Sequence, residues 1–306
     1  MRKLTALIAS TMLAFSLAAC GGGGTSDIQE PSEVSSEDVA QTDDEEAVDE
    51  DAPEESSPAQ EATIEETVLL DEAGVKVTAK SLESNWYGPQ IKLLVENNSG
   101  KNLTVQSRNE SINGYMCETM FSCDVDDGKK ANDTLTFSEN QLELSGVDSI
   151  AEMEFSLHIF DQDTWDAYYD SDPIVLKTSI AGSYEQAYDD SGEVAYDDNG
   201  VKIVVKGRSD DSSWLGPSVI VEVVNTRNDI ITVQARNTSI NGFMIEPFFS
   251  ADVCPGKRVL DGITFASSDL EDNDIEEIES VELSFHVCDA NSFDDIVDTG
   301  TVTINF

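Results

Sequence analysis

Positive charge is what this sequence has least of. Lys and Arg together number 17 against 62 Asp and Glu, which gives a formal net charge of −45 at pH 7. Proteins that bind nucleic acid neutralise its phosphates with clustered Lys and Arg, so we exclude nucleic acid as a partner. The same charge repels anionic lipid headgroups, and a basic patch therefore cannot hold the chain at a membrane. The negative charge is compatible with basic or cationic partners.

Histidine and cysteine are scarce as well, with two and five residues in the chain. Structural zinc sites are built from Cys and His at short spacings such as CxxC, and no such spacing occurs here. No other cofactor motif occurs at a plausible spacing. We therefore expect neither a metal nor a cofactor.

Long hydrophobic runs are missing except at the N-terminus. Met1-Arg2-Lys3 precedes an apolar stretch from Leu4 to Ser16, which is too short to span a membrane and predicts a cleaved export signal over residues 1–19. Leu17-Ala18-Ala19-Cys20 closes this signal and resembles the lipobox of bacterial lipoproteins, in which the cysteine is acylated and the signal is cut before it. That resemblance implies a lipidated Cys20 that anchors the protein to the membrane. The alternative is an ordinary secretory signal with an incidental cysteine.

An acidic, low-complexity segment follows Cys20. From Gly21 to Glu66 it contains no Lys or Arg, few large apolar residues, and runs such as Asp43-Asp44-Glu45-Glu46. Such a composition cannot bury enough apolar surface to offset the loss of chain entropy. We predict a disordered tether over residues 20–66, with an acidic tail that binds a basic partner or cations as the alternative.

The rest of the chain is a tandem duplication. Residues 86–89 match 214–217, residues 108–116 match 236–244, and residues 154–158 match 282–286, all at an offset of 128 positions. Before Trp86 and its equivalent Trp214 the offset is two residues shorter, so that Gly74 aligns with Gly200. A repeat of this length indicates two copies of one domain. We place the copies at residues 67–179 and 192–306, with a linker at 180–191.

Apolar and polar residues alternate within each copy, as at Ile91, Leu93 and Val95 and at the equivalent Val219, Val221 and Val223. A period of two predicts half-buried strands, and turn signals such as Asn113-Gly114 fall between them. The predicted fold class is therefore all-β, with two tandem immunoglobulin-like β-sandwiches. Short helical turns are expected at residues 138–145 and 268–273.

This layout resembles a class of Gram-positive lipoproteins that carry a lipobox, an acidic tether and immunoglobulin-like domains of unknown function. The lipobox is the only specific motif in the resemblance. It implies an extracytoplasmic, non-catalytic protein and carries over no binding residues.

A hydrolase centred on the histidines is the main enzymatic alternative. Ser156, His158 and Asp161, with a second histidine at His286, invite comparison with a catalytic triad. Residues i and i+2 of a strand lie about 6.6–6.8 Å apart, which is too far for direct proton transfer. We therefore predict outward-facing histidines and no catalytic residues.

Calcium binding by the acidic loops is a further alternative. Residues 124–128 and the loop with Asp161, Asp163 and Asp166 offer carboxylates, but neither fits the EF-hand spacing. The second copy has Cys254-Pro255 where the first has Asp126-Asp127, which indicates a turn rather than a metal site.

The residues around the Asn-Gly hairpin form the candidate binding patch. Asn-Gly is a strong type I′ turn signal, so its repetition has a structural explanation, and Trp in a sandwich is usually a core residue. Aromatic and Arg side chains nevertheless make good binding hot spots. The candidate patch comprises Trp86, Arg108, Asn113 and Tyr115 in the first copy and Trp214, Arg236, Asn241 and Phe243 in the second.

Four cysteines follow Cys20, two in each copy and none at equivalent positions. Cys117 and Cys123 lie in the first copy, and Cys254 and Cys288 in the second. Paired occurrence favours one disulfide in each copy, which an extracytoplasmic location allows. Four free thiols are the alternative.

Taken together, these features predict a lipoprotein on the cell surface, held at the membrane by Cys20, that acts as a non-catalytic binding module for a protein or a glycan. The first alternative is a structural spacer of the envelope. A surface hydrolase or a calcium-binding protein is less favoured.

Overall fold

The structure, a computed structural model, describes residues 62–213 and 215–306, without the side chains of residues 210–213. The predicted signal at 1–19, the predicted lipidation site Cys20, the tether before residue 62 and the candidate residue Trp214 all lie outside the described residues. Among the described residues, no helix has the length and apolar character needed to cross a bilayer.

The described part of the chain is all-β, as the alternation predicts, and it contains one short helix in each repeat. The elements of the first repeat are β1 (Thr67–Glu72), β2 (Val75–Asn85), β3 (Gly88–Asn97), β4 (Leu103–Ile112), β5 (Tyr115–Met116), β6 (Thr119–Met120), β7 (Ser122–Val125), β8 (Lys129–Phe137), α1 (Glu139–Leu144), β9 (Glu152–Asp161), β10 (Ala167–Asp170) and β11 (Ile174–Lys177).

The second repeat has the same order of elements. They are β12 (Glu193–Asp198), β13 (Val201–Ser213), β14 (Gly216–Asn225), β15 (Ile231–Ile240), β16 (Phe243–Met244), β17 (Ser250–Val253), β18 (Arg258–Thr264), α2 (Ser267–Asp272), β19 (Ser280–Asp289), β20 (Asp295–Asp298) and β21 (Val302–Asn305). An isolated bridge between Phe248 and Thr264 takes the place of the pairing between Met120 and Thr136 in the first repeat.

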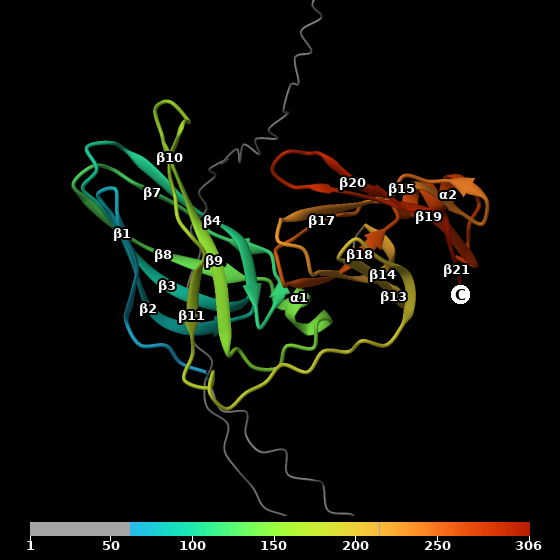
Figure 1. The fold of residues 1–306 in the computed structure, drawn as a ribbon, viewed down its shortest axis with the longest axis horizontal. Coiled ribbons are helices and arrows are strands. Elements are labelled where there is room, and N and C mark those ends of the chain that lie inside the picture. The colour runs from blue at the N-terminus through green and yellow to red at the C-terminus, as the bar shows by residue number, and fades with distance from the viewer. Residues whose placement is uncertain (1–61, 214) are drawn as a thin grey trace, which may run out of the picture. The chain divides into compact units, whose positions relative to one another are not determined.

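Each repeat is a sandwich of two antiparallel layers. In the first repeat one layer has the order β1-β2-β3-β8-β6, and the other is built on β9 and β4, with β5 and β7 beside β4 and β10 and β11 beside β9 (Figure 1). In the second repeat β12, β13, β14 and β18 form one layer, and β15, β19 and their short neighbours form the other. One parallel pair, Tyr115 with Arg258, joins β5 to β18.

The alternating residues fill a separate hydrophobic core in each repeat. Phe137 and Phe155 in the first core, and the equivalent Phe265 and Phe285 in the second, are among the largest fully buried side chains. Burying a side chain of this kind contributes about 1.5–3 kcal/mol. The period-two pattern therefore identified the inner faces of the long strands correctly.

The Asn-Gly hairpins form as the sequence predicts. Asn113 and Gly114 connect the paired residues Ile112 and Tyr115, with φ of +49° and +87°. The equivalent Asn241-Gly242 turn has +49° and +86°. Positive φ at both central residues is what a type I′ turn requires.

The two extra residues of the second repeat also have a place in the structure. They lie between Ser209 and Ser213, where the pairing of β13 with β14 changes register. The same part of the β2–β3 pair, from Glu83 to Asn85, is regular. The insertion is therefore accommodated at the end of the β13–β14 hairpin.

Candidate functional site

The β2–β3 turn presents a tryptophan to solvent. Trp86 and Tyr87 form a two-residue loop between the paired residues Asn85 and Gly88. Trp86 is 80% exposed and Tyr87 47%, and their ring centroids lie 3.5 Å apart with a tilt of 31°. Trp86 is thus not the core residue that its presence in a sandwich would suggest.

Backbone contacts hold this turn in place. The Tyr87 amide donates to the Asn85 side-chain oxygen at 2.8 Å, and the Glu139 amide donates to the Tyr87 carbonyl at 3.0 Å. Gly88 has a φ of +134°, and a Cβ there would lie 2.3 Å from the Phe137 carbonyl oxygen. Only glycine fits this position, so the turn is tied both to β8 and to the first residue of α1.

A hollow of about 450 Å³ lies beside the turn. Met120, which is 58% exposed, and Glu118 and Glu139 line it together with the two aromatic residues. We call Trp86, Tyr87 and Met120 the aromatic surface. It is a cluster of exposed large apolar side chains with carboxylates at its edge, which the sequence patterns did not single out as a group.

Arg108 lies near this surface. It is exposed on β4 and lines a neighbouring hollow, and Glu118 and Thr119 line both hollows. The structure therefore brings two of the four predicted patch residues of the first repeat, Trp86 and Arg108, to adjacent parts of one face.

Asn113 has a structural role instead. Its side-chain oxygen accepts hydrogen bonds from the amides of Ala151 and Glu152 at 2.9 and 3.1 Å, and its amide group donates to the Ser149 carbonyl at 2.7 Å. Asn241 makes the same three contacts with residues 277–280. Both side chains clamp the hairpin to the segment before β9 or β19, which explains their repetition without a ligand.

Tyr115 is also unavailable to a partner, because it is only 3% exposed. Its ring lies 5.5 Å from that of Tyr188 and 5.8 Å from the guanidinium carbon of Arg258. Burial raises the pKa of the Tyr115 hydroxyl. In the second repeat the equivalent Phe243 is 47% exposed and Arg236 is exposed, so the two candidate patches do not match.

The serine, histidine and aspartate of the considered triad each have other partners. His158 Nδ1 lies 2.5 Å from Asp170 Oδ1, the Ser156 hydroxyl donates to the Arg108 carbonyl, and Asp161 pairs with Lys101. His286 pairs with Asp298 in the same way. His286 is buried at 5% exposure, although it lies on the outer face of its strand. The three groups therefore do not assemble around one reacting atom.

The acidic loops are likewise engaged within the protein. Asp161 accepts from Lys101 at 2.5 Å and from the Asp163 amide at 2.9 Å, and the lysine lowers the pKa of Asp161. Asp127 accepts from the Gly100 amide at 2.8 Å. Across residues 62–213 and 215–306, no group of three or more His, Cys, Asp or Glu is placed to hold a metal ion.

The four described cysteines are free thiols, so the predicted disulfide in each copy is wrong and the alternative of four free thiols holds. Cys117 contacts the Ser138 carbonyl, whereas Cys123 contacts Asp133, ten residues away along the chain. Cys254 follows β17 and Cys288 lies on β19, and β15 runs between these two strands. Strands two places apart are separated by about 10 Å, whereas disulfide formation requires Cα atoms within about 7 Å.

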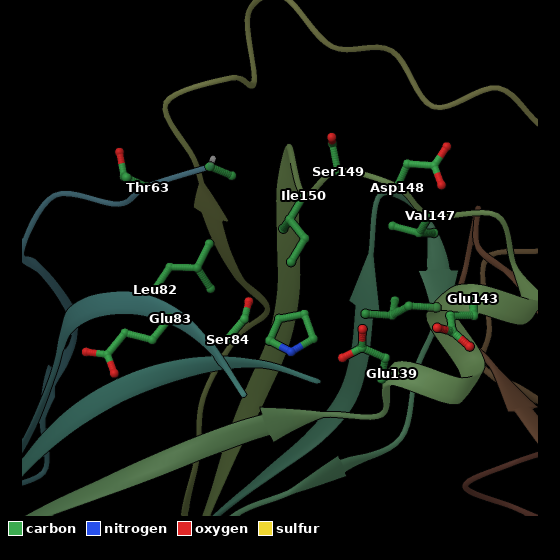
Figure 2. Close-up of a pocket in the computed structure, with 13 residues that line it drawn as sticks. Thr63, Leu82, Glu83, Ser84, Glu139, Glu143, Val147, Asp148, Ser149 and Ile150 are labelled. Carbon is green, nitrogen blue, oxygen red and sulfur yellow. The ribbon is translucent and has the colours of Figure 1, made fainter. Parts of the chain in front are cut away.

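A second hollow of the first repeat has a different character. It has a volume of about 490 Å³ and lies between the end of the β2–β3 hairpin and α1. Leu82, Val147 and Ile150 supply apolar side chains, and Glu139 and Glu143 on α1 supply carboxylates, as Figure 2 shows. We call it the helix pocket. Its lining comes from separate stretches of the chain, at residues 62–63, 82–84, 89, 139–143 and 147–150, so no local sequence motif indicates it.

No protein-family model and no curated protein matches the chain. Among solved structures, the YadV chaperone is similar to it, at 13% sequence identity over 71% of this chain and 92% of that chain, with a TM-score of 0.22. A likeness this distant carries no argument about function.

Proposed function

We propose that this protein is a non-catalytic binding module, anchored outside the cytoplasm by lipid on Cys20, whose first repeat binds a protein partner through the aromatic surface. The observation that carries the proposal is the 80% exposure of Trp86 on a turn that the backbone holds in place. Trp and Tyr are enriched among the residues that dominate binding energy, and a pre-ordered turn loses little entropy on binding.

The composition of the aromatic surface supports a protein ligand. Trp86, Tyr87 and Met120 offer a large apolar area, and Met adapts to irregular partner surfaces. Contiguous exposed apolar side chains with a polar rim are typical of interaction sites. The role of a structural spacer does not require an exposed apolar surface of this kind.

The rim predicts the charge of the partner. Glu118 and Glu139 border the aromatic surface, and no ion pair engages either carboxylate among the described residues. Together with the net charge of −45, this favours a partner with Lys or Arg around an apolar centre. Association with such a partner should weaken as ionic strength rises.

The decisive experiment is site-specific photo-crosslinking in cells, with a benzophenone amino acid in place of Met120, followed by binding measurements on the purified partner. Trp86→Ala should weaken binding by at least thirtyfold, since hot-spot truncations cost about 2 kcal/mol or more. Trp165→Ala is the matched control, because Trp165 is 71% exposed in the same repeat but lies on the β9–β10 loop. Equal affinities for Trp86→Ala and the unmodified chain would refute the proposal. Trp86-dependent binding of an envelope glycan would show that the partner class is wrong.

The anchor is tested separately. Mass spectrometry should find the chain beginning at Cys20 with a diacylglyceryl group, and Cys20→Ser should release the protein from the membrane fraction. An unmodified cysteine on a membrane-free protein would refute the lipid anchor and leave the aromatic surface untouched.

A further inference from the structure

The helix pocket occurs in both repeats. The second repeat has a hollow of about 560 Å³ at the equivalent place. All seven lining residues of this hollow align with lining residues of the first pocket. Besides the pair Leu82 and Arg208, the pairs are Pro89 and Pro217, Leu142 and Leu270, Val147 and Ile275, Asp148 and Glu276, Ser149 and Glu277, and Ile150 and Ile278. The fold therefore builds this concavity twice, between the hairpin and the short helix.

The two pockets differ in several side chains, and one of these differences replaces an apolar residue with a cation. Leu82 of the first repeat is replaced by Arg208 in the second. The Arg208 guanidinium donates to the Ile278 carbonyl at 2.6 Å and lies 5.5 Å from the ring centroid of Phe306. The pocket of the second repeat is thus lined by a guanidinium from the protein's own chain.

In the first repeat the same carbonyl is satisfied differently. The Ile150 carbonyl accepts from the Thr178 hydroxyl at 2.6 Å, and Thr178 aligns with Phe306. No cationic side chain lines the first pocket. Its wall at Leu82 is apolar where the second repeat has a positive charge.

The carboxylates of the first pocket are available to a ligand. Among the described residues, the side chains of Glu139, Glu143 and Asp148 make no hydrogen bond or ion pair with another side chain. Glu83 differs, because Lys92 lies 3.8 Å from it. The pocket combines an apolar floor with an uncompensated negative rim.

We propose that the helix pocket of the first repeat binds the side chain of an Arg or Lys from a basic segment of another protein. The aliphatic stem would pack on Leu82, Val147 and Ile150, and the cation would face Glu139, Glu143 and Asp148. The volume lies within the range of small-ligand sites, which is about 300–1,000 Å³. Glu139 also lines the hollow of the aromatic surface, so a bound segment can extend from one hollow to the other, which a free amine cannot.

The test is a methyl NMR titration of the full chain with a tetra-arginine peptide and its tetra-citrulline counterpart, which keeps the shape and removes the charge. The methyl groups of Leu82, Val147 and Ile150 should shift saturably with the arginine peptide only. Glu139→Gln/Glu143→Gln should weaken binding about fivefold, which corresponds to about 1 kcal/mol in total for two exposed ion pairs. Glu271→Gln/Asp272→Asn removes the same charge from α2 and should leave the affinity unchanged.

A second variant tests the pocket without removing its carboxylates. Leu82→Arg reproduces the arrangement of the second repeat and should abolish the methyl shifts by placing an internal guanidinium in the pocket. Val68→Arg adds the same charge at a 49% exposed position of β1 and should not. Equal weakening by the α1 and α2 variants, shifts with the citrulline peptide, or normal binding by Leu82→Arg would each overturn the proposal. None of these results depends on Trp86, so the proposed function stands or fails separately.

Discussion

The guanidinium of Arg208 donates a 2.6 Å hydrogen bond to the carbonyl oxygen of Ile278. This contact replaces the Thr178 hydroxyl that serves Ile150 in the first repeat. Arg208→Leu should therefore lower the free energy of unfolding by about 1–2 kcal/mol, because the carbonyl of a buried residue loses its side-chain donor. Urea denaturation measures this change.

Arg236→Leu is the control for that prediction. Arg236 is exposed, and among the described contacts its side chain hydrogen-bonds only to Gln234, two residues away. Its replacement should change the stability by less than about 0.5 kcal/mol, as is usual for surface positions. Equal effects of the two variants would show that the Ile278 contact contributes nothing specific.

Asn113→Ala should be among the more damaging single substitutions in the first repeat. It removes the acceptor for two backbone amides and the donor to the Ser149 carbonyl. We expect a loss of about 2–3 kcal/mol, measured as a shift of the urea midpoint at constant slope. Asn132→Ala, at an exposed position of β8, should have almost no effect. A recognition role for Asn113 would instead leave stability intact and reduce binding.

The buried cysteines should resist alkylation. Burial raises the pKa of the Cys117 and Cys123 thiols to about 12, and that of Cys254 to about 11. Because the thiolate is the reactive form, iodoacetamide at pH 8 should label a native Cys20→Ser protein roughly a thousandfold more slowly than the same protein in urea. Mass spectrometry without reductant should find four free thiols. Rapid labelling of the native protein, or a mass two units lower for each bridge, would contradict the structure.

Acid should weaken the fold partly through Asp161. Lys101 lowers the pKa of this carboxyl in the folded state, so its contribution to stability is complete above the unfolded value of about 3.9 and is lost as the pH falls through the folded value. The unmodified chain should therefore lose more stability between about pH 5 and pH 2 than Asp161→Asn does. Thermal melts across this range measure the difference, and parallel curves would refute it.

The sequence predicted the architecture well because the repeat and the period-two alternation both report on burial along regular strands. Phe137, Phe155 and their equivalents follow directly from that pattern. The turns at Asn113 and Asn241 follow from backbone preference alone. The short helices were expected within about a residue of where they lie.

The candidate site was harder to predict because its residues lie where the alternation ends. Trp86 sits in a two-residue loop, so periodicity says nothing about its burial. Tyr115 and Asn113 look like surface residues of a hairpin, but contacts distant in sequence bury one and engage the other. The residues that line the helix pocket come from separate stretches between residues 62 and 150, and only the fold brings them together.

The exchange of Thr178 for Phe306 sets different mutational tolerances for two aligned positions. The hydroxyl of Thr178, directly after β11, already satisfies the Ile150 carbonyl, so residue 82 is not needed as a hydrogen-bond donor. Residue 208 has no such freedom, because its side chain completes the local hydrogen bonding. A change to another apolar side chain should therefore be tolerated at position 82, whereas an apolar side chain at position 208 should be destabilising.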